Sequence, residues 1–205
     1  MKTTYFILLA LAVFSFTACN KNQKQSASIN LIPSGPFSKT AGSLFSIDTL
    51  NKWIGNYSRT YKSIGNSSLF DATAIKALSS ADNSLGVMFY FINIQNKWAL
   101  TAIGVNSLGE LIKTDSVLSS AGKVSWDQAI AMVNEYKTRH PDSIWGEFFG
   151  TTSLSNFIDQ NQVHFISVQR GINHNGMRLI ITNATPSGYN PVGLEEAFPC
   201  PPVCP

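Results

Sequence analysis

The stretch SWDQAIAMVNEY (residues 125–136) opens the segment that decides the fold, which continues to Gly188. This segment repeats an earlier one, which opens with SIDTLNKWIGNY (residues 46–57) and ends at Gly109. An ungapped overlay gives eight identical pairs: Ser46/Ser125, Asp48/Asp127, Tyr57/Tyr136, Phe70/Phe149, Thr73/Thr152, Asn96/Asn175, Leu100/Leu179 and Gly109/Gly188. Self-similarity at a fixed period indicates a repeated structural unit. The sequence therefore predicts a tandem duplication, with a first unit over residues 44–110, a connection over 111–123 and a second unit over 124–190.

Both units begin with a pattern typical of a helix. Apolar residues recur at steps of three and four after Ser46 and after Ser125. Each serine hydroxyl is a suitable helix cap, and Gln128 completes a capping box with Ser125. Gly65 in the first unit and Pro141 in the second are expected to end these helices.

A second, shorter helix is predicted in each unit. Asp71 and Thr152 are its expected caps. Its buried face carries two apolar residues in each copy: Ile75 and Leu78 in the first, Leu154 and Phe157 in the second. Each unit thus continues from one helix directly into another.

The period then changes to two, which indicates strands. Alternating apolar residues run from Leu85 to Phe91 and again from Trp98 to Ala102, and Asn175-Gly176 is a favoured hairpin turn in the second unit. Each unit is therefore predicted to be helix, helix, strand, strand. The fold class is α+β, an antiparallel sheet packed by helices, built either as one four-stranded sheet or as two smaller sheets that share a core. Leu100 and Leu179 are expected at equivalent inward-facing positions.

The first residues indicate export. A basic Lys2, an apolar run and Thr17-Ala18-Cys19 are typical of a signal peptide over residues 1–18, followed by a lipid-carrying Cys19. An ordinary signal with a chance cysteine is the alternative. Residues 19–43 are rich in Asn, Gln, Ser, Gly and Pro, which predicts a flexible tether. The expected location is the outer membrane, with the periplasmic side favoured because residues 20–24 contain no acidic residue of the kind that often marks surface export.

Composition excludes some classes of function. Apolar residues make up 44% of the chain and charged residues 13%, which favours a well-buried fold over disorder. The net charge of +3 is spread without any run of Lys or Arg, so we expect no nucleic-acid partner. The expected partners are the membrane, through the N-terminal lipid, and a protein or small molecule that the sequence does not identify.

The sequence contains no nucleophile, phosphate-binding or metalloprotease motif, so we predict no catalytic residue, metal ligand or cofactor. His164 and Arg170 are the candidate site residues, since they replace Leu85 and Phe91 of the first unit and share strand parity. The alternative is that both lie at strand ends where the core gives way to solvent.

The last residues, 191–205, form a tail rich in Pro that contains Cys200 and Cys204. In an oxidising compartment these cysteines are expected to form a local disulfide. Metal binding, redox work and free thiols are the alternatives. Because proline disfavours helix and removes backbone donors, we expect the tail to be extended and on the surface.

Three features together carry a resemblance to a known group. They are the helix Val133–Lys137 with His140-Pro141 after it, the aromatic step Glu147–Gly150, and the ending from Cys200 to Cys204. In these features the chain resembles small uncharacterised Bacteroidetes lipoproteins that share a Cys-Pro-Pro-x-Cys tail. That group often has Gly-Ile-Arg in its first strand, where this chain has Phe165–Ser167, so a role for that arginine does not carry over. The resemblance implies a fold and a location and leaves the function open.

The sequence favours a lipid-anchored cell-envelope protein that acts as a non-enzymatic binding or interaction module. The alternative is a small envelope enzyme, or a metal- or redox-handling protein, that uses His or Arg residues of the second unit or the terminal cysteines.

Overall fold

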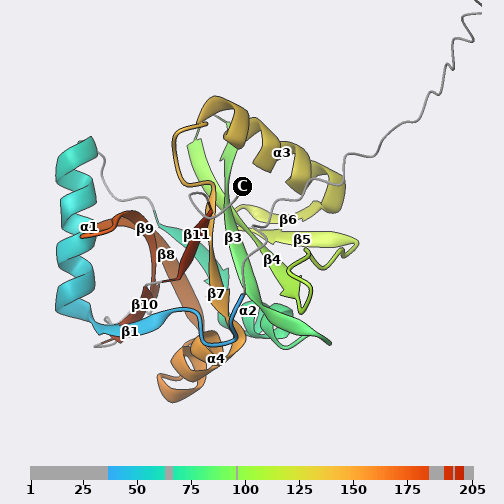
Figure 1. Ribbon diagram of the computed structural model, residues 1–205, viewed down its shortest axis with the longest axis horizontal. Coiled ribbons are helices and arrows are strands. Elements are labelled where there is room, and N and C mark those ends of the chain that lie inside the picture. Colours follow the sequence, from blue (N-terminus) through green and yellow to red (C-terminus); the bar gives the residue numbers. More distant parts are fainter. Residues whose placement is uncertain (1–36, 63–66, 96, 185–191, 196, 201–205) are drawn as a thin grey trace, which may run out of the picture.

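The computed structural model describes residues 37–62, 67–95, 97–184, 192–195 and 197–200 (Figure 1). These residues form four helices: α1 (Ile47–Tyr61), α2 (Ala72–Ser79), α3 (Trp126–Arg139) and α4 (Thr151–Gln160). They also form eleven strands: β1 (Ser43–Ser46), β2 (Ser68–Asp71), β3 (Ser84–Ile94), β4 (Lys97–Asn106), β5 (Ser116–Ser119), β6 (Gly122–Ser125), β7 (Gly146–Gly150), β8 (Phe165–Asn173), β9 (Gly176–Asn183), β10 (Val192–Glu195) and β11 (Phe198–Cys200). The predicted signal peptide, Cys19 and most of the tether lie outside the described residues, as do Gly65 and Cys204.

The strands form two antiparallel sheets. The five-stranded sheet has the order β1-β10-β9-β8-β2, and the six-stranded sheet has the order β11-β7-β3-β4-β5-β6. The α+β class with antiparallel sheets and packed helices is therefore confirmed. Of the two arrangements expected from the sequence, the protein adopts the one with two sheets.

Each sheet combines strands from both halves of the chain. The hairpin β8–β9 of the second half pairs with β2 of the first, while the hairpin β3–β4 of the first half pairs with β7 of the second. Strands β2 and β7 lie between the two helices of their half, where the sequence analysis predicted no strand. They were missed because four or five residues are too few to show a period of two. Neither half completes a sheet without the other.

The element bounds recur along the chain. When the first half is laid over the second with Ser46 on Ser125, β1 coincides with β6 at both ends. In the same overlay α1 and α3 begin together, and so do α2 and α4. This recurrence agrees with the repeated sequence pattern, and the tandem duplication itself stays a prediction.

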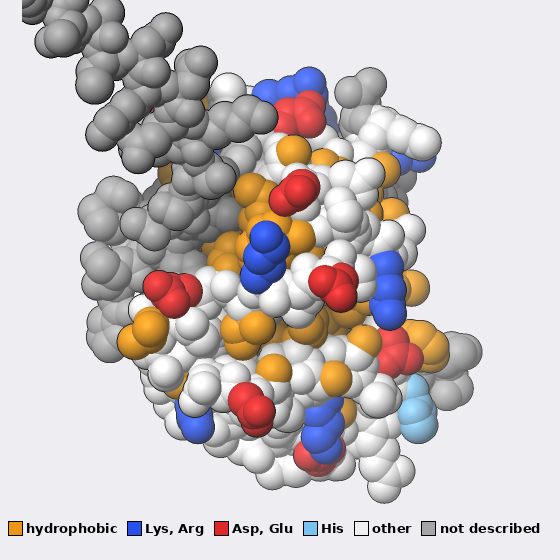
Figure 2. All heavy atoms as spheres, turned by 90° about the vertical axis from the view of Figure 1, so that its right-hand side faces the viewer, with side chains coloured by type: hydrophobic (Ala, Val, Ile, Leu, Met, Phe, Trp, Pro, Cys, Tyr) orange, Lys and Arg blue, Asp and Glu red, His pale blue; other side chains and the backbone are white. Residues whose placement is uncertain are grey.

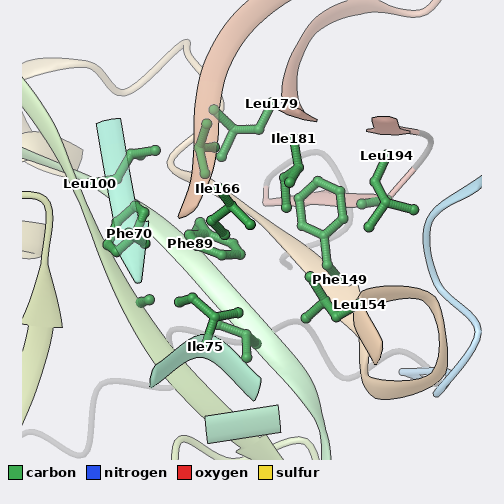
Figure 3. Close-up of a cluster of buried hydrophobic side chains, with 14 of the residues drawn as sticks. Phe70, Ile75, Phe89, Leu100, Phe149, Leu154, Ile166, Leu179, Ile181 and Leu194 are labelled. Carbon is green, nitrogen blue, oxygen red and sulfur yellow. The ribbon is translucent and has the colours of Figure 1, made fainter. Parts of the chain in front are cut away.

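The main core lies between the two sheets, where apolar side chains from both sheets and from α2 and α4 point toward one another (Figure 3). Leu100 and Leu179 are both fully buried in it, as expected. A second cluster lies on the other face of the six-stranded sheet, under α3. Helix α1 packs on the five-stranded sheet along β8, and α2 and α4 lie side by side at one end of the molecule (Figure 1).

The predicted helix caps are mostly confirmed. Ser125 and Gln128 form the capping box at the start of α3, and Asp71 Oδ1 accepts the backbone N–H of Ala74 at 2.9 Å. Helix α3 ends at Arg139, just before His140-Pro141. The expected cap Thr152 is wrong: the N-cap of α4 is Gly150, two residues earlier, and the backbone N–H of Thr152 donates to Lys39 C=O at 2.7 Å.

Three segments that the sequence analysis treated as loop or tail belong to the fold. The end of the predicted tether is packed, since the Phe37 ring lies 4.7 Å from that of Phe148. The connection over residues 111–123 contains β5 and the first half of β6. The tail contributes β10 and β11, and Cys200 is fully buried because β11 pairs with β7. The extended shape is confirmed for these strands, but the surface placement is wrong for Cys200. Its disulfide with Cys204 stays a prediction.

Candidate functional site

The two candidate residues from the sequence do not form a common site. His164 is exposed just before β8 begins, and its backbone C=O accepts the N–H of Ala72 at 2.9 Å. Arg170 lies further on, half-buried in the middle of β8. Because they are an even number of residues apart, the sequence predicted that both side chains lie on the same face of one strand. Their separation along the strand keeps them apart.

Arg170 is held by aromatic rings between the two sheets. Its guanidinium carbon lies 4.3 Å from the ring centroid of Trp98 and 4.6 Å from that of Phe91. Its Nη1 donates to Tyr57 Oη at 2.8 Å. A guanidinium over aromatic faces gains cation–π stabilisation, so these contacts give Arg170 a role in joining β8 to β3, β4 and α1.

A buried acidic cluster was missed by the sequence analysis. Glu147 of β7 and Glu195 of β10 are both fully buried, and Arg178 Nε lies 3.8 Å from an Oε1 of each. Glu195 also accepts from Asn173 Nδ2 at 3.0 Å, and Glu147 accepts the backbone N–H of Leu179. The signal that was available is a lone glutamate inside an apolar strand, between Gly146 and Phe148.

Burial raises the pKa of the Glu147 carboxyl to about 8, although the Leu179 N–H and the Arg178 guanidinium both act to lower it. The nearby Glu195 carboxylate acts in the same direction as burial. Glu147 therefore stays protonated in the folded protein at neutral pH. Since Glu147 reaches from the six-stranded sheet to the backbone of β9 in the five-stranded sheet, the cluster ties the two sheets together.

An apolar hollow lies between α2 and the hairpin β5–β6. It has a volume of about 360 Å³, within the range usual for ligand pockets. Ala74, Ala77 and Leu78 line it from α2, Ala81 lines it just after the helix ends, and Gly104 of β4 also lines it. We call this hollow the α2 groove.

The opposite wall of the α2 groove is more polar. Leu118 of β5 lies directly across from Lys123 of β6, and both line the groove together with Ser116 and Thr114. Figure 2 views the side of the molecule on which α2 and the β5–β6 hairpin lie, and its hydrophobic side chains gather centrally with single charged side chains around them. The groove thus combines an apolar body with one cationic group.

A second hollow, of about 440 Å³, lies next to the end of α2 and is lined mainly by polar residues. Lys39 and Asp82 supply its charges. Thr151, also in its wall, already donates its hydroxyl to Ser79 C=O at 2.7 Å.

Within the described part of the chain, no three or more His, Cys, Asp and Glu side chains gather in a way that would hold a metal ion. The helices found there include none that is both long enough and apolar enough to cross a membrane. Comparison with protein-family models, with curated proteins and with solved structures gave no match to this chain.

Proposed function

We propose that this chain is an exported, lipid-anchored binding protein of the cell envelope, and that it works without catalysis. The observation that carries the proposal is the α2 groove, an open apolar hollow of about 360 Å³ on a well-packed domain. The ionisable residues that would favour an enzyme do not converge on one pocket. His164 lies apart from Arg170, and Glu147 is enclosed in the core.

The test of binding compares two matched variants. Ala77 is exposed on α2 at the edge of the groove, and Asn156 is exposed at the matching position of α4. Ala77→Trp fills the groove, whereas Asn156→Trp adds the same bulk on α4, away from it. The chain from Asn20 onward, which retains all described helices and strands, is used to capture molecules from envelope extract. We expect Ala77→Trp to lose the captured molecules and Asn156→Trp to keep them. Equal capture by both variants would contradict a groove-based binding function.

The anchoring part of the proposal rests on the apolar run that ends in Thr17-Ala18-Cys19 and on the likeness to Bacteroidetes lipoproteins. Cys19→Ala in the full chain should release the protein from the membrane fraction or leave the signal peptide uncut. A variant that fractionates and migrates like the wild type would show that Cys19 carries no lipid. The tandem duplication is part of the same proposal for the origin of the fold.

A further inference from the structure

The α2 groove has mostly apolar walls and one cationic residue on its hairpin side, which restricts what it can hold. Two alanines and Leu78 of α2, with Ala81 just after the helix, supply one wall, and the half-buried Leu118 and Ile112 line the groove as well. The charge is supplied by Lys123, the one ionisable residue among those that line the groove in the described chain. An occupant with a long apolar part and an anionic end matches this arrangement.

The hairpin side of the groove has the donors that an anion needs. Lys123 is exposed and lines the hairpin side of the groove. Ser116 is exposed on the same wall and offers a hydroxyl. The Thr114 hydroxyl donates to Ser116 C=O at 2.8 Å, so it offers lone pairs only. Lys123 and Ser116 are therefore the groups that would contact a carboxylate.

The size of the groove suits a ligand with a single alkyl chain. A volume of about 360 Å³ is near the lower limit of ordinary ligand pockets. There is little spare room at Gly104, where a Cβ would lie 3.2 Å from the Ile112 side chain and 3.3 Å from the Leu78 carbonyl oxygen. A second acyl chain, as in a membrane phospholipid, or an amphipathic peptide helix needs a wider trough.

We propose that the α2 groove binds a free single-chain carboxylate such as a medium-chain fatty acid, with the alkyl chain along α2 and the carboxylate at Lys123 and Ser116. This inference rests on the proposed binding function and adds the class of ligand. Burial of the chain drives binding, so each added methylene strengthens it about fourfold until the groove is full, the ratio set by about 0.8 kcal/mol per buried methylene. The positive Lys123 selects the carboxylate over a cationic head group.

The test uses dodecanoate and titration calorimetry on the chain from Asn20 onward. We expect one site, a weaker response to octanoate than to dodecanoate, and at least tenfold weaker binding of dodecyltrimethylammonium. Lys123→Glu should weaken dodecanoate binding at least tenfold, and Ala77→Trp should abolish it. Lys52→Glu, an exposed charge reversal on α1, and Asn156→Trp should leave it unchanged.

Three outcomes overturn the proposal. Equal binding of dodecanoate and dodecyltrimethylammonium would remove the role of Lys123. Binding to anionic phospholipid vesicles but not to dodecanoate would identify a membrane surface as the occupant. Absence of dodecanoate binding, while Ala77→Trp still abolishes capture from extract, would reject this ligand class and leave the binding function standing. If Ala77→Trp changes neither measurement, the binding function fails as well.

Discussion

Helices α2 and α4 occupy equivalent positions in the two halves of the chain, but they pack differently against neighbouring strands. Helix α4 packs against β10 and β1, and Ser153 Oγ donates to Gly42 C=O at 2.8 Å. Helix α2 is separated from β5 and β6 by the α2 groove. The side chains explain the difference: Phe157 fills the core under α4, whereas Leu78, at the matching position of α2, is half-buried at the groove wall. The same order of helices and strands therefore gives a closely packed side at α4 and an open side at α2.

The largest expected effect comes from truncating these two residues. Phe157→Ala removes a fully buried ring and should lower the free energy of unfolding by about 3–5 kcal/mol. Leu78→Ala should cost less than half as much, because part of the Leu78 side chain already contacts solvent in the groove. Urea denaturation of both variants measures the difference. Equal losses would mean that the groove is closed in solution.

Leu100 and Leu179 are a pair of equivalent positions at which the two halves are alike. Both leucines are fully buried in the core between the sheets (Figure 3), so each Leu→Ala change should cost about 2–5 kcal/mol. The same denaturation experiment checks this. A near-neutral result for either leucine would contradict a core shared equally by the two sheets.

The buried glutamate Glu147 has no counterpart in the first half of the chain, because Ser68 is the equivalent residue when the two halves are overlaid. With a folded pKa of about 8 against an ordinary 4.5, Glu147 keeps its proton in the folded state after the unfolded chain has lost it. Its contribution to stability is therefore complete below about pH 4.5 and is lost as the pH rises toward 8, with a slope of at most about 1.4 kcal/mol per pH unit.

Glu147→Gln should flatten this dependence between pH 5 and 8, since an amide keeps the shape of the carboxyl and does not ionise. Thermal unfolding of the wild type and the variant over this range is the measurement. A wild type that gains stability steadily toward pH 8, unchanged by the substitution, would show that Glu147 is ionised in the fold.

The smallest effect is expected where α2 and α4 touch. Lys76 Nζ lies 2.6 Å from Asp159 Oδ1, but both side chains are about half exposed. An exposed ion pair contributes about 0–1 kcal/mol, and salt screens it. A double-mutant cycle with Lys76→Ala and Asp159→Ala should give a coupling in that range, lower still in high salt. A much larger coupling would mean that this pair holds the two helices in place.

The features that the sequence predicted correctly are local in the chain. The capping box of Ser125 and Gln128, the cap at Asp71 and the hairpin between β8 and β9 each depend on residues close to one another in sequence. The turn of this hairpin is His174-Asn175, one residue before the predicted Asn175-Gly176, because Gly176 already pairs with Asn173. The exchange of β2 and β7 between the halves depends on pairing of distant strands, which no local pattern encodes.

The sites were missed for the same physical reason. The bond from Leu179 N–H to Glu147 joins residues that are distant in sequence, and Glu195 comes from a segment taken for a free tail. The α2 groove exists because α2 meets a hairpin that lies beyond β3 and β4 in the chain. The one signal of the groove in the sequence was the recurrence of alanine at positions 74, 77 and 81. The helical pattern predicted that Leu78 is buried in the core. Leu78 is only half-buried, whereas Phe157 at the matching position is fully buried.

The most direct test of the difference between the two sides is nuclear magnetic resonance of the isotopically labelled chain from Asn20 onward, titrated with dodecanoate. We expect chemical shifts to change at Ala77, Gly104 and Leu118 around the α2 groove, while those of Asn156 and Phe157 on α4 stay unchanged. Shift changes centred on α4, or spread evenly over both helices, would contradict the claim that the open side of the fold is the binding side.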